Sequence, residues 1–184
     1  MADLSGLIDL IPVGDIAKQL GIPEEVAESA VKTAIPAIIS GMAANASDSA
    51  GAKSLEGALS NHGKKVPTGK AKVETIDTAD GEKIVKNVFG AKTPEVEAAV
   101  AKASAGDVTK DIIAKVLPII APIVIAWVGS QFLGQKQEPA KETKAEAPAS
   151  DGGIGDLLGG LLGSSQGQEI IGSVLGGLLG GGKK

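Results

Sequence analysis

The sequence contains no cysteine, no arginine and no tyrosine among its 184 residues. The lack of cysteine excludes disulfides, thiolate metal sites and a cysteine nucleophile. All 18 cationic residues are lysine, the formal net charge is −4, and aromatic residues make up only 2% of the chain. Because arginine and aromatic side chains are the usual means of reading bases and stacking on them, we expect no nucleic-acid partner.

A secretory signal is also missing from the start of the chain. The first residues, MADLSGLIDLIPVGD, lack a basic region and carry Asp3 and Asp9. A signal peptide begins with positive charge, so we expect a cytoplasmic protein.

His62 is the single histidine. A histidine can serve as a general base or a metal ligand, but a triad or a zinc site needs further histidines or cysteines. His62 comes directly before Gly63, a residue typical of helix ends, so it is better explained as the last residue of a helix. There a protonated histidine interacts favourably with the helix dipole. A hydrolase using His62 with a nearby acid is a remote alternative, which requires polar groups that converge in a pocket.

Other charged clusters have ordinary structural explanations. Two of the carboxylate pairs follow prolines at the start of predicted helices, where the dipole favours acids, so we expect no metal and no cofactor. A basic cluster is a candidate for contact with an anion or nucleic acid, but a solvated loop is our preferred interpretation. The acid pairs are Glu24/Glu25, Glu95/Glu97 and Asp107/Asp111, and the basic cluster is Lys64, Lys65, Lys70 and Lys72.

What the sequence does have is small aliphatic residues and clear helix punctuation. Hydrophobic residues make up 43% of the chain, nearly all of them alanine, isoleucine, leucine and valine, which favours an all-α fold. Expected caps are Asp15, Asp80 and Thr93 at helix starts and Gly21 after a helix end. Helices are predicted over 4–11, 15–20, 23–46, 49–61, 80–90, 93–106 and 107–134.

A weak internal repeat divides this helical region, 1–134, into halves of about 15–62 and 80–134. Ile16 to Val31 parallels Ile84 to Val100, and Ile35-Pro36 parallels Leu117-Pro118. The two halves could pack as a pseudo-symmetric bundle, although chance similarity in alanine-rich sequence explains the pattern as well. The intervening stretch, 63–79, is predicted to be a loop with a short extended piece at Val73 and Ile76.

The segment from Val116 to Gln135 carries no charge over 20 residues, long enough to span a membrane by count. Its strongly apolar part stops at Val128, and such a helix covers only about 20 Å of a hydrocarbon core of about 30 Å. We therefore predict a buried core helix, with insertion into lipid as the alternative.

The C-terminal region has a different composition. Residues 135–153 alternate lysine and glutamate with alanine and proline, which is typical of a disordered linker. In 154–184, glycines recur every four residues beside leucines, so in a helix each set would form a bare backbone stripe. The predicted self-association or docking residues are Gly155, Gly159, Gly163, Gly172, Gly176, Gly180, Leu158, Leu162, Leu175 and Leu179.

Several segments together resemble a known bacterial family. These are LGIPEEVAESAVKTAIPAIISGMAANA, LEGALSNHG, DGEKIVKNVFG, LPIIAPIVIAWVG and the LLGGLLG tail. The chain is similar over about 16–134, and more loosely over the tail, to the YidB-like proteins, a domain-of-unknown-function family. The resemblance implies a multihelical bundle with two buried central helices and no established activity. The 64–79 loop and the lysine-glutamate linker fit the family pattern poorly.

These observations lead to one functional expectation and two alternatives. We expect a non-enzymatic bacterial helical protein whose tail contacts a second copy or another protein, and no small-molecule substrate is identified. The first alternative is a membrane-associated or lipid-active protein, with the tail and the apolar helix in contact with lipid. The second is the hydrolase described above.

Overall fold

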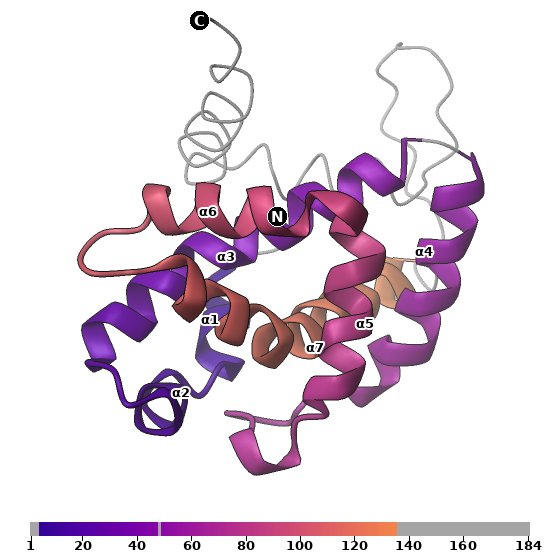
Figure 1. Ribbon diagram of the computed structural model, residues 1–184. Coiled ribbons are helices and arrows are strands. Elements are labelled where there is room, and N and C mark those ends of the chain that lie inside the picture. The colour runs from indigo at the N-terminus through magenta and orange to yellow at the C-terminus, as the bar shows by residue number, and fades with distance from the viewer. Residues whose placement is uncertain (1–3, 48, 136–184) are drawn as a thin grey trace, which may run out of the picture.

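The structure, a computed structural model, describes residues 4–47 and 49–135. Every regular element of this part of the chain is a helix, and no strand occurs in it (Figure 1). The predicted all-α class is therefore confirmed. The elements are α1 (Leu4–Leu10), α2 (Val13–Leu20), α3 (Glu24–Asn45), α4 (Ser49–His62), η1 (Gly63–Lys65), η2 (Val73–Thr75), α5 (Thr78–Phe89), η3 (Gly90–Lys92), α6 (Thr93–Ala103) and α7 (Lys110–Gln135).

Helix α7 is the centre of the bundle. It contacts each of the helices α1 to α6, and Figure 1 shows it passing through the middle of the fold with α5 crossing in front of it. Its side chains from Ile123 to Val128 are all buried, including Trp127, which is 6% exposed. A helix that is apolar on every side is stable in water only when neighbours surround it, and here they do.

The same helix is also the one described segment that is long and apolar enough to cross a membrane. That segment runs from Lys110 to Leu133, and 72% of its most apolar window is buried inside the domain. In this structure α7 packs as a core helix, as the short strongly apolar stretch predicts.

Helix α3 is the second buried helix. Its middle is fully apolar on the sides that face α2, α6 and α7, and Thr33 is buried there as well, with its hydroxyl donating to the Ser29 carbonyl. Together α3 and α7 account for the two central helices that the family resemblance implies. The buried residues of α3 are Ala27, Ala30, Val31, Thr33, Ala34, Ile35, Pro36, Ala37, Ile38, Ile39 and Met42.

Gly63, Gly81 and Gly129 let segments approach until backbones touch, and Gly41 makes room for the side chains of Val88 and Phe89. A Cβ on Gly63 would lie 2.6 Å from the Gly129 carbonyl carbon, and a Cβ on Gly129 would lie 2.9 Å from the Gly63 Cα. A Cβ on Gly81 would overlap the Pro118 carbonyl, and one on Gly41 would lie 2.6 Å from a ring carbon of Phe89. The ends of α4 and α5 are therefore held directly against α7 and α3.

The Gly81 contact falls where α7 has a free backbone acceptor. Pro122 has no N–H, so it cannot donate to the Pro118 carbonyl four residues earlier. The Cα of Gly81 lies against this carbonyl, where Cα–H groups form weak hydrogen bonds.

Several helix starts differ from the predicted ones. Asp77, and not Asp80, caps α5: its carboxylate accepts from the Asp80 N–H at 3.0 Å, so Asp80 lies in the first turn. Helix α2 begins at Val13, before Asp15, and α6 begins at Thr93 itself, whose hydroxyl donates to the Gly90 carbonyl. Helices α2 and α5 start before the polar residue that we expected to cap them, and α6 starts at that residue.

Other boundaries are corrected or confirmed by the same comparison. Helix α6 ends at Ala103 and not at Gly106, and α7 begins at Lys110, where the Thr109 hydroxyl accepts from the Ile112 N–H at 3.3 Å. Gly21 has a left-handed φ of 66° after α2, as predicted.

The stretch 63–79 is less extended than we predicted. It contains the short 3-10 turns η1 and η2. Val73 lies in η2, whereas Ile76 has the extended backbone that we predicted, as does Lys72 on the other side of η2. The stretch is tied to the start of the chain, because the Ala71 N–H donates to the Leu10 carbonyl at 2.8 Å.

The two proposed halves have their helices in the same order, but a long helix that is continuous in the first half is divided in the second. Ile16 and Ile84 are buried at matching positions of short helices, and so are Val31 and Val100 in the helices that follow. In the first half one helix, α3, carries the whole pattern, whereas in the second half residues 104–109 divide it into α6 and α7.

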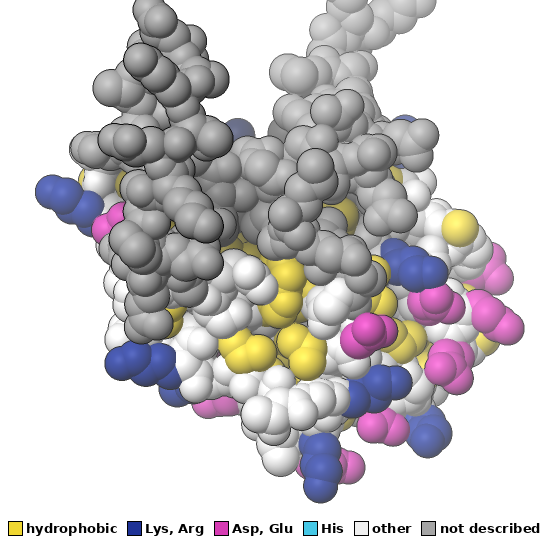
Figure 2. All heavy atoms as spheres, turned by 180° about the vertical axis from the view of Figure 1, so that it is seen from behind, with side chains coloured by type: hydrophobic (Ala, Val, Ile, Leu, Met, Phe, Trp, Pro, Cys, Tyr) yellow, Lys and Arg dark blue, Asp and Glu magenta, His cyan; other side chains and the backbone are white. Residues whose placement is uncertain are grey.

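Charged side chains of both signs are spread around the surface. Figure 2 shows hydrophobic side chains gathered in the middle of the face seen from behind, with lysine, aspartate and glutamate side chains around them. Ion pairs are few among the described residues, and one of them joins the exposed Lys110 to the partly buried Glu97 at 3.9 Å.

Candidate functional site

The described domain has an open pocket of about 770 Å³ where the end of α4, the 65–77 stretch, the start of α5 and one side of α7 meet. Its floor is apolar and comes from α7, and its rim is polar. A pocket of this size lies in the range of sites for small organic ligands. The lining residues are His62, Lys65, Pro67, Thr68, Gly69, Lys70, Ala71, Lys72, Thr75, Ile76, Asp77, Asp80, Pro122, Ile123 and Ala126.

His62 is the last residue of α4, as predicted from its place before Gly63. Its Nε2 lies 3.7 Å from Oδ2 of Asp80, and the two side chains are 18% and 36% exposed. At this separation the contact is an ion pair only when the imidazole is protonated, and the distance is too long for a direct hydrogen bond. The nearby acid that the hydrolase alternative requires is thus present and lines the same pocket as His62.

The carboxylates of the pocket already have partners. Asp77 accepts from the Asp80 N–H as the α5 cap, and Asp80 faces His62. No group of three or more histidine or acidic side chains with metal-binding geometry occurs in the described part of the chain.

The lysines of the pocket have no such partners. Lys65, Lys70 and Lys72 line the rim, and none of them forms an ion pair with any residue that the structure describes. All three are exposed, which agrees with the predicted solvated loop. Lys64 is exposed as well, but it does not line the pocket.

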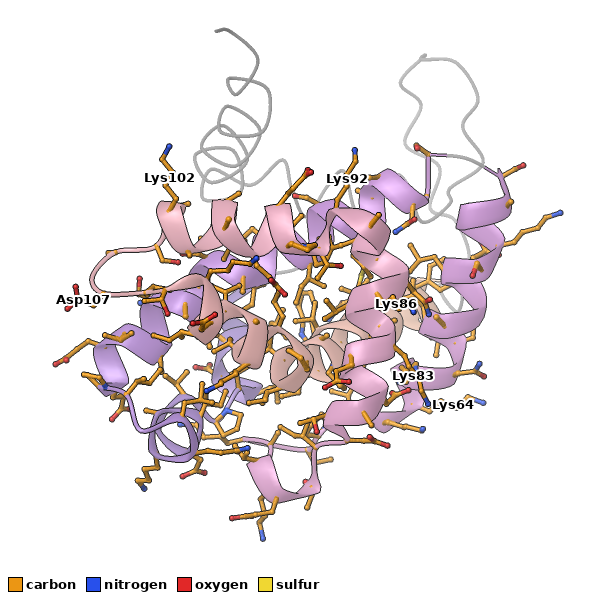
Figure 3. All side chains as sticks on the ribbon, in the orientation of Figure 1. Lys64, Lys83, Lys86, Lys92, Lys102 and Asp107 are labelled. Atoms are coloured by element: carbon orange, nitrogen blue, oxygen red, sulfur yellow. The ribbon has the colours of Figure 1, made fainter. Side chains whose placement is uncertain are left out.

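The remaining candidates do not form a site. Glu24 and Glu25 lie in the first turn of α3, Glu95 lies in the first turn of α6, and Asp111 lies in the first turn of α7, which fits the predicted role of acids at helix starts. Figure 3 shows Asp107 pointing outward from the loop before α7. The predicted glycine and leucine contact residues of the tail, the linker and the whole of 154–184 lie outside the described residues.

Sequence reasoning missed the residues that build the walls of the pocket. Gly63 and Gly81 seat the ends of α4 and α5 on α7, which brings His62 and Asp80 together across 18 positions of sequence. Asn45 adds a third link, because its amide donates to the Val88 carbonyl at 2.9 Å and joins α3 to α5. The sequence alone does not show that Gly63 lies against another backbone, because this depends on which helix packs against it.

Comparison with models of protein families identifies the family of this helical domain. A family model described as a bacterial protein of unknown function, DUF937, matches residues 4–131. The chain belongs to the DUF937 family. The DUF937 match extends through the 64–79 stretch, which we had expected to depart from the family pattern, and it ends within α7. Comparison with curated proteins and with solved structures gave no match for this DUF937 member.

Proposed function

We propose that this DUF937 protein is a non-enzymatic bacterial binding module of the cytoplasm whose glycine-leucine tail associates with a second copy of the chain. The observation that carries the proposal is the four-residue spacing of glycines beside leucines, in Gly155 to Gly163 and in Gly172 to Gly180. In a helix this spacing leaves a strip of bare backbone next to an apolar face, which is suited to close helix contact.

The described domain already uses glycines for close contact between backbones, which supports the same role for the glycines of the tail. At Gly63 and Gly129 the same chain uses glycine to bring two backbones together, and at Gly81 it does so again against Pro118. The domain also buries its own apolar residues, since the core cluster extends from Leu7 to Phe132. The proposal therefore assigns the leucines of the tail to a contact with a second copy of the chain.

The composition of the linker favours contact between the tail and a second molecule. Residues 135–153 are rich in charge, alanine and proline, and such a segment gives the tail reach from the domain. Once one tail is bound to a partner, a linked second contact forms at a raised effective concentration.

The test is the mass of the full chain in solution. Light scattering after size exclusion should give a mass above the 18.3 kDa of one chain, rising with concentration, whereas a chain ending at Gln135 should remain monomeric. The shortened chain should keep its helical circular dichroism, because it retains every residue of the core cluster from Leu7 to Phe132. A full chain that is monomeric at all concentrations contradicts the proposal, and co-sedimentation of that monomer with liposomes would assign the tail to a membrane surface instead.

A further inference from the structure

We propose that the pocket between α4, α5 and α7 binds a small organic anion, a molecule with a phosphate or carboxylate group on an apolar body. The proposal is independent of the tail, because every residue that lines the pocket belongs to the described domain.

The charge of the rim indicates that the ligand is negatively charged. Lys65, Lys70 and Lys72 bring three ammonium groups without carboxylate partners to the rim, and these outnumber the two carboxylates of the lining, Asp77 and Asp80. Unpaired ammonium groups bind oxyanions through charge-assisted hydrogen bonds. The hydroxyl of Thr68 on the same rim is a further donor.

The apolar floor of the pocket indicates that the ligand has an apolar body as well as a charged group. Pro122, Ile123 and Ala126 present one apolar side of α7, and Pro67 and Ile76 extend it from the opposite wall. A bare inorganic ion would leave this surface in contact with water, whereas an organic body would cover it. The pocket volume of about 770 Å³ accommodates such a molecule.

The walls of the pocket are packed against α7 and against the start of the chain. Gly63 holds the end of α4 on Gly129, and Gly81 holds the start of α5 on Pro118. The lysine-bearing stretch is anchored at Ala71 by its hydrogen bond to Leu10. Walls that are held by such packing lose little conformational entropy when a small molecule binds, which favours affinity.

The test uses phenyl phosphate as the probe, titrated into the isotope-labelled full chain and followed by backbone amide shifts. Saturable shifts are expected at residues 65–72 and in α7 around Ile123, whereas phenol and inorganic phosphate should each bind more weakly. Changing Lys65, Lys70 and Lys72 together to glutamine should weaken phenyl phosphate binding about tenfold or more.

The matched control changes three other exposed lysines, Lys83, Lys86 and Lys92, to glutamine. Figure 3 shows them on α5 and at the turn after it, pointing into solvent, and none of them lines the pocket. This variant has the same net charge as the pocket variant and should bind phenyl phosphate as the unchanged chain does. The inference fails if the lining residues show no saturable shift, if both variants lose equal affinity, or if phenol binds as tightly as phenyl phosphate. The mass of the chain in the same samples reports on tail association separately.

Discussion

Gly63 lies directly against the backbone of Gly129, and neither position has room for a side chain. A Cβ on Gly63 would come within 3.0 Å of the Ser130 nitrogen as well as 2.6 Å from the Gly129 carbonyl carbon. These atoms are backbone and cannot rotate away as the end of a flexible side chain would. The position therefore selects glycine for space, since its φ is not positive and other residues could adopt its backbone conformation.

We predict that Gly63→Ala lowers the free energy of unfolding by about 2 kcal/mol, because α4 must move away from α7. Gly57→Ala is the matched control in α4, the helix that ends just before Gly63, and nothing lies within 4 Å of its added Cβ. That change should raise the free energy of unfolding by up to about 1 kcal/mol, because alanine is the better helix former. Urea unfolding followed by the fluorescence of the buried Trp127 measures both, and equal effects of the two changes would refute the steric argument.

Among the elements, α7 is the one on which all the others depend. It contacts every other α-helix of the described domain, and its residues Val116 to Val128 are almost entirely buried. Helix α4 is different, since only Leu55 and Leu59 among its side chains are buried. The stability of the two elements should therefore be unequal.

We predict that hydrogen exchange separates these two helices. Backbone amides of residues 116–128 should exchange only through global unfolding, whereas those in the first turns of α4, from Ser49 to Glu56, should exchange faster through local opening. Mass spectrometry of exchanged peptides measures the difference. Rapid exchange across α7 would contradict its placement at the centre of the core and would favour the alternative that it partitions into lipid.

For the whole molecule, local signals in the sequence predicted the helices well and the site poorly. Apolar periodicity and the glycine and proline punctuation around Gly21 and Pro23 indicated helices close to those observed. The pocket was not predicted, because it depends on which helices meet. His62 and Asp80 become neighbours only through the contacts of Gly63 and Gly81 with α7, and a single sequence carries no signal for such long-range pairs.

The cap errors have a related cause. Asp77 and Asp80 are both suitable caps by composition, and the choice between them depends on where the chain leaves the 63–77 stretch. The tail stays a prediction, since its glycines and leucines lie beyond the described residues.

The most direct measurement of the association proposal is the mass of two matched full-chain variants by light scattering. The first changes the stripe glycines Gly159 and Gly176 to valine, and the second changes their neighbours Gly160 and Gly177, which lie beside the stripes, in the same way. The account predicts that the stripe variant becomes monomeric while the neighbour variant keeps the mass of the unchanged chain, because only stripe positions need a bare backbone. Equal masses for both variants, or a monomeric unchanged chain, would contradict it.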